Sequence, residues 1–131
     1  MPPFKTARPL LLALALAAPL LARAETPTAV REDVRYLLGF IEKSGCSFYR
    51  NGSWSDAKAA EAHVRMKYDY LADRSEINTV KDFIEKAASV SSFTGSPYQV
   101  KCPGSAPMLS RAWLGEELAR YLARGNKVTS R

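Results

Sequence analysis

The chain has 131 residues, of which 24% are charged and 47% are hydrophobic, and its formal net charge is +6. This length predicts one small domain. The Lys and Arg residues are scattered among the Asp and Glu residues and form no dense basic block. The charge pattern therefore argues against a nucleic-acid-binding protein.

The first 24 residues have the order of a secretory signal. Lys5 and Arg8 form a basic start, an apolar run covers residues 10–18, and residues 22–24 read Ala-Arg-Ala, with small residues at both specificity positions. The run is too short to span a bilayer, and no cysteine follows it to carry a lipid anchor. We therefore expect export with cleavage after Ala24. Residues 25–131 would then form a single compact domain without a membrane span.

Cys46 and Cys102 are the two cysteines of the chain. In an oxidising compartment an even pair is most simply a structural disulfide. Their spacing is not the C-x-x-C of redox-active pairs, and two cysteines with a single histidine are too few for a convincing zinc site. We therefore expect a structural disulfide, with no metal and no other cofactor.

Residues 28–74 contain two predicted helices and a turn. Apolar residues at helical spacing predict a first helix over 28–44, capped at its start by Thr26-Pro27 or Thr28. A short aromatic strand at 46–50 follows, and Asn51-Gly52 after it is a strong turn signal. We expect Ser53 or Ser55 to cap a second helix that runs to about residue 74.

The remainder of the chain alternates loops with a strand and two further helices. A third helix begins at Thr79, and residues 91–97 are polar and punctuated by Gly and Pro, which indicates a loop. Residues 98–102 alternate strictly and predict a second strand. Ser110 would cap a last helix that stops at Gly125, which leaves residues 126–131 as a frayed tail.

These elements predict an α+β fold that is mostly α. About four helices would pack around a small two-stranded antiparallel sheet, stapled by one disulfide. Two strands alone are marginally stable in water, so the helices must cover them.

His63 is the single histidine, so any imidazole base would have to be this residue. It lies near the apolar stripe of the second helix, and Lys67 follows one turn later. A hydrolase or transferase would need Ser91 or Ser92 beside it, yet the sequence has no G-x-S-x-G or other nucleophile signature. The simpler interpretation is a histidine at the edge of the core that bonds a backbone group or a loop serine.

Two polar clusters, Arg50-Asn51 and Ser91-Ser92, flank the two predicted strands. If the cysteines are bonded, both clusters lie beside one small sheet, where an Arg fork and serine hydroxyls suit a carboxylate or phosphate. The alternative is a capped turn and the end of a helix. The candidate ligand-binding residues are Arg50, Asn51, His63, Lys67, Ser91 and Ser92. The sequence does not identify a catalytic residue.

Four segments resemble the YfeK-like family of small exported bacterial proteins, a domain of unknown function. They read SGCSFYRNGSW (44–54), EAHVRMKYDYL (61–71), DFIEKAASVSSFTGSPYQVKC (82–102) and WLGEEL (113–118). The family pattern favours Leu where this chain has Val64. The resemblance implies a bacterial periplasmic protein with a signal peptide and a paired cysteine, and it implies no activity.

We therefore expect a non-enzymatic binding or interaction module of the bacterial envelope. Its partner would be an envelope protein, a peptide or a small anionic ligand, and the sequence gives no indication of oligomeric state. Two alternatives stay open. One is a small periplasmic hydrolase or transferase that uses His63, and the other is an inhibitor of a foreign enzyme directed at the envelope.

Overall fold

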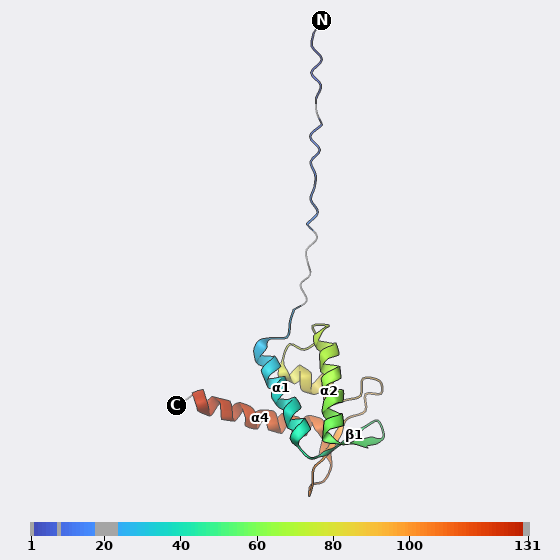
Figure 1. Ribbon diagram of the computed structural model, residues 1–131, viewed down its shortest axis with the longest axis vertical. Coiled ribbons are helices and arrows are strands. Elements are labelled where there is room, and N and C mark those ends of the chain that lie inside the picture. The colour runs from blue at the N-terminus through green and yellow to red at the C-terminus, as the bar shows by residue number, and fades with distance from the viewer. Residues whose placement is uncertain (1, 8, 18–23, 130–131) are drawn as a thin grey trace.

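The computed structural model describes residues 2–7, 9–17 and 24–129, with only the backbone of residues 126–129 (Figure 1). The described residues before 18 contain no helix or strand and lead away from the folded part of the chain (Figure 1). Arg8 and two residues of the predicted cleavage sequence, Ala22 and Arg23, lie outside the described residues. The last two residues of the predicted tail also lie outside them.

The first helix, α1 (Thr28–Lys43), has the span that the apolar spacing predicts. Its buried side is formed by residues at helical spacing, namely Val34, Leu37, Leu38 and Ile41. Pro27 is the N-cap residue, as the Thr26-Pro27 prediction allows, but neither threonine side chain caps the helix. Gly45 follows the helix at a φ of 67°, a conformation that glycine adopts without strain.

The Asn51-Gly52 turn joins two short strands, β1 (Ser47–Arg50) and β2 (Ser53–Ser55). Asn51 and Gly52 both have positive φ, of 48° and 86°, as the tight two-residue hairpin turn requires. Ser53 and Ser55 are therefore strand residues, and the prediction that they cap the next helix is wrong. Asp56 caps α2 (Ala57–Ala72) instead, because its carboxylate accepts a hydrogen bond from the Ala59 amide.

The third helix begins where Thr79 predicts it. Thr79 and Asp82 form a reciprocal capping box around α3 (Val80–Asp82), which continues directly into a π-helical turn, η1 (Phe83–Ala87). Phe83, Ile84 and Ala87 are buried there. The turn leads into residues 88–98, which carry part of the site described below.

In the described residues the sheet has four antiparallel strands, in the order β2-β1-β3-β4. The predicted pairing is confirmed, because β3 (Gln99–Lys101) lies antiparallel to β1, and the predicted Cys46–Cys102 disulfide joins their neighbouring ends. The expected two-stranded sheet is wrong because β2 and β4 (Met108–Leu109) extend it on either side. Strands of two or three residues are too short to show a period in sequence.

The last helix, α4 (Ser110–Thr129), is longer than predicted and continues through Gly125. A glycine inside a helix costs only about 1 kcal/mol and does not by itself end the helix. Ser110 begins the helix, but its hydroxyl has no hydrogen-bond partner among the described residues, so it does not cap the helix as predicted.

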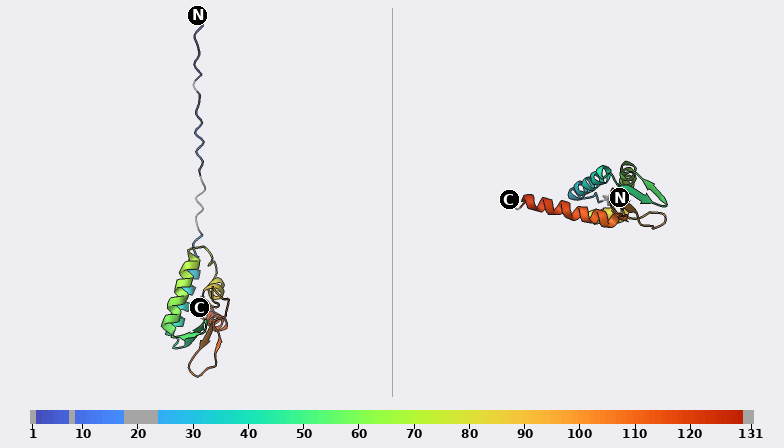
Figure 2. Two further views of the ribbon diagram at one scale, coloured as in Figure 1. Left: turned by 90° about the vertical axis from the view of Figure 1, so that its right-hand side faces the viewer. Right: turned by 90° about the horizontal axis from the view of Figure 1, so that it is seen from below.

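Helices α1 and α2 lie side by side, and α4 runs across the domain with its C-terminal end beyond the other helices (Figures 1 and 2). Aromatic pairs join α1 to α4. The rings of Tyr36 and Tyr121 stack with centroids 3.9 Å apart, and those of Phe40 and Trp113 with centroids 4.5 Å apart. None of the helices in the described part of the chain is long and apolar enough to cross a membrane.

Candidate functional site

All six candidate residues predicted from sequence line one pocket of about 100 Å³, which we call the basic pocket. It lies where the end of β1, helix α2, the loop over residues 91–97 and the start of β3 meet. Three further residues complete its wall, which consists of Arg50, Asn51, His63, Met66, Lys67, Ser91, Ser92, Phe93 and Tyr98.

Lys67 is the deepest charge of the basic pocket, with only 8% of the residue exposed. Helix α2 places it one turn after His63, so both side chains point from the same face. Its ammonium donates one hydrogen bond to the Val90 carbonyl at 2.6 Å and another to the Tyr98 hydroxyl at 3.1 Å. No carboxylate of the described residues lies within 4 Å of this ammonium, so its charge is bonded but not neutralised.

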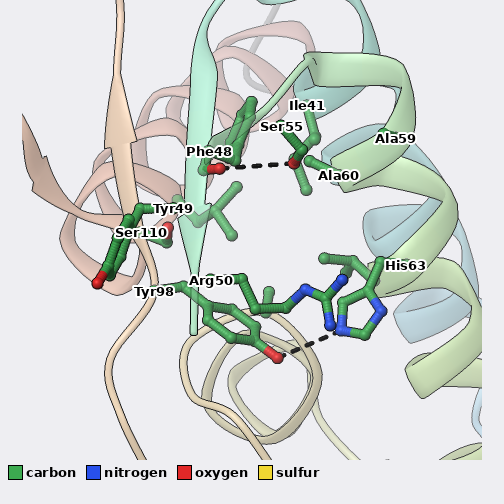
Figure 3. A pocket seen from close by; sticks show the side chains of 13 residues that line it. Ile41, Phe48, Tyr49, Arg50, Ser55, Ala59, Ala60, His63, Tyr98 and Ser110 are labelled. Carbon is green, nitrogen blue, oxygen red and sulfur yellow. Dashed lines mark hydrogen bonds between the residues drawn. The ribbon is translucent and has the colours of Figure 1, made fainter. Parts of the chain in front are cut away.

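Tyr98 connects the two basic side chains of α2. Its hydroxyl oxygen accepts from Lys67 and lies 3.3 Å from Nε2 of His63 (Figure 3). The arrangement that satisfies all three groups has the tyrosine O–H donating to an unprotonated Nε2. A neutral His63 fits this arrangement.

The pKa values of these groups are shifted by burial and by mutual repulsion. Burial and the nearby Arg50 guanidinium lower the pKa of Lys67 to about 8. Burial, Arg50 and Lys67 together lower the pKa of His63. Burial raises the pKa of Tyr98, although Arg50 opposes this shift. At neutral pH the pocket therefore holds charged Lys67 and Arg50 beside a neutral imidazole and a neutral phenol.

A hydrogen-bonded bridge holds the turn of the hairpin against the loop over residues 91–97. The Asn51 amide donates to the Ser91 hydroxyl at 3.0 Å, and the Thr94 hydroxyl donates to the Asn51 amide oxygen at 3.0 Å. The Ser91 hydroxyl also accepts from the backbone amides of Phe93 and Thr94. Asn51 and Ser91 thus fix the rim of the basic pocket.

The lining of the basic pocket contains no carboxylate. Glu61 is on α2 as well, but it forms an ion pair with Arg65 and does not line the pocket. Within the described part of the chain, no three His, Cys, Asp or Glu side chains come together as a potential metal site. The charges of the pocket therefore suit an anion.

A second pocket of about 70 Å³, which we call the apolar pocket (Figure 3), shares part of its wall with the basic pocket. Arg50, His63 and Tyr98 line both pockets. The remainder of its wall is mostly apolar and consists of Ile41, Phe48, Tyr49, Ser55, Ala59, Ala60, Val64, Ala88, Ser110 and Leu114.

Sequence reasoning did not identify Tyr98 as a site residue, although it is the central hydrogen-bonding group. The strict alternation of residues 98–102 placed its side chain on the same face as the buried Val100. A buried tyrosine hydroxyl normally has a hydrogen-bond partner, so the predicted burial of Tyr98 could have indicated a polar side chain beside it. The identity of the partner depends on how α2 lies against β3, which a periodic pattern does not contain.

Comparison with known proteins gives a family without an assigned activity. An uncharacterised protein of Salmonella typhimurium, YfeK, is 39% identical over 62 residues, which are 47% of this chain. The chain covers about half, 50%, of the length of that relative. No solved structure matches the chain. The model of the family of unknown function DUF5329 matches residues 28–122, and the chain therefore belongs to this family.

Proposed function

We propose that the protein is a non-enzymatic binding module of the bacterial cell envelope, and that its basic pocket binds a small anionic ligand. The observation that carries this proposal is the buried ammonium of Lys67, which lies with Arg50 in a pocket whose lining contains no carboxylate. Burial of an unpaired charge is costly. An anion bound in the pocket would offset that cost.

The donors around the basic pocket match an oxyanion. Arg50 supplies a planar fork, Lys67 a point charge, and Ser92 a hydroxyl on the rim. Asn51 and Ser91 hold one another in place, so the rim is formed before a ligand arrives. Such preorganisation lowers the entropic cost of binding.

The alternative, a hydrolase or transferase that uses His63, has less support. Nε2 of His63 faces the Tyr98 hydroxyl, and no hydrogen bond joins His63 to Ser91 or Ser92 in the described residues. The Ser91 hydroxyl instead bonds Asn51 and two backbone amides. A serine activated by His63 would need its hydroxyl within hydrogen-bond reach of the imidazole.

Titration of the purified protein with sulfate and with acetate, followed by NMR, tests the proposal. Lys67→Met and Arg50→Gln should each weaken binding at least tenfold, because a hydrogen bond to a charged group contributes about 1.5–3 kcal/mol. Lys58→Met is the matched control, since Lys58 is exposed on the same helix and lines neither pocket. Equal affinities for all four proteins would contradict the proposal.

A further inference from the structure

We infer that the ligand of the basic pocket is an organic carboxylate with a short apolar chain, and that this chain lies in the apolar pocket. The inference rests on the proposed function, because it names the chemical class of ligand that the same site takes.

The two pockets share part of their walls. Arg50, His63 and Tyr98 line both. In Figure 3 these three residues lie at one end of the apolar pocket, while Phe48 and Ala60 lie toward the other. An anion bonded to Arg50 is therefore placed at the entrance of an apolar compartment.

The two pockets also differ in chemistry. Arg50 and Lys67 give the basic pocket its positive charge, whereas Val64 and Leu114 in the apolar pocket are nearly fully buried hydrophobic residues. An inorganic anion would occupy the basic pocket alone. A carboxylate with an apolar chain would bury hydrophobic surface in addition, and each buried methylene contributes favourably.

The size of the apolar pocket limits the length of the chain. Its volume of about 70 Å³ is smaller than that of an engineered cavity, about 150 Å³, that holds benzene. We therefore expect room for about three or four carbons beyond the carboxylate. Longer chains would extend into solvent and gain little.

NMR titration of the purified protein with straight-chain carboxylates, from acetate to octanoate, tests the inference. Affinity should increase about fourfold with each added methylene and then level off near butyrate or valerate. Methyl resonances of Val64 and Leu114 should shift with the longer carboxylates and not with acetate.

A pair of alanine variants on α2 shows where the chain lies. Ala59 is exposed and lines the apolar pocket, whereas Ala62 is exposed on the same helix and lines neither pocket. Ala59→Leu should lose most of the gain in affinity with chain length. Ala62→Leu should behave like the unchanged protein.

The outcomes separate this inference from the proposed function. If acetate binds and the affinity does not change with chain length, the inference is wrong and the anion site stands. If the affinity rises with chain length equally in both alanine variants, the chain lies elsewhere and the inference is also wrong. If neither acetate nor sulfate binds, the proposed function is wrong and the inference fails with it.

Discussion

Lys67 affects stability and binding in opposite ways. Its buried charge lowers the free energy of unfolding, but the same charge is what would attract an anion. The fold buries its amine without a carboxylate partner, which lowers its pKa from 10.5 to about 8. The unfolded chain therefore binds more protons than the folded protein between these two pH values. Across this window the free energy of unfolding rises with pH. The stability gained when the buried amine loses its charge is lost again as the pH falls through about 8.

This relation predicts a pH effect that Lys67→Met removes. Relative to that variant, the unchanged protein should gain on the order of 1–3 kcal/mol of stability between pH 7.5 and pH 10. Urea unfolding at several pH values measures the difference, with Lys58→Met as the exposed control. If both variants follow the same pH dependence as the unchanged protein, Lys67 has an ordinary pKa.

At the scale of elements, the disulfide holds the two strands that carry the site. It joins the ends of β1 and β3, and these strands lead to Arg50 and to Tyr98. Helix α4 is joined to α1 instead, by the two aromatic pairs and by the hydrogen bond that Tyr36 donates to Glu117. Burial would raise the pKa of this carboxyl, but hydrogen bonds from Tyr36, Arg120 and Arg124 lower it below its ordinary value.

Removal of the disulfide should therefore destabilise the whole domain. The closed loop spans a sequence separation of 56 residues, for which chain entropy gives about 4 kcal/mol. We expect the double variant Cys46→Ala/Cys102→Ala to lose about 2–4 kcal/mol in urea unfolding. A denaturation midpoint that is the same with and without a reducing agent would show that the bond contributes nothing.

Much of the site could be predicted from the sequence, because its parts depend on local periods and one strand pairing. Helical spacing placed His63 and Lys67 on one face, and the cysteine pair brought Asn51 close to Ser91. Tyr98 and the apolar pocket could not be predicted in the same way. Apolar periodicity predicts that Val64 belongs to the core. It does not show whether the side chains that face Val64 fill the space around it or leave a pocket.

At the scale of the whole molecule, we propose that residues 1–24 direct export of the protein. The leucines described in this segment, such as Leu11 and Leu16, are almost fully exposed, which suits a segment that is removed and not one that packs in the core. An oxidising compartment also suits the Cys46–Cys102 bond. Both observations support the proposed export.

Cleavage after Ala24 is a direct prediction of this account. Mass spectrometry of the protein from the periplasmic fraction of a bacterial host should show a chain that begins at Glu25. Leu12→Arg/Leu14→Arg, which breaks the apolar run, should leave the full-length chain in the cytoplasm. Full-length protein with an intact N-terminus in the periplasm would contradict the prediction.

The central claim is that the basic pocket binds an anion, and an acetate titration followed by backbone amide NMR at pH 7 tests it most directly. We expect saturable shifts concentrated at Arg50, Lys67 and residues 91–93, and in Lys67→Met these shifts should need at least ten times more acetate. Shifts that do not saturate, that spread over the surface, or that saturate at the same acetate concentration in Lys67→Met would contradict it.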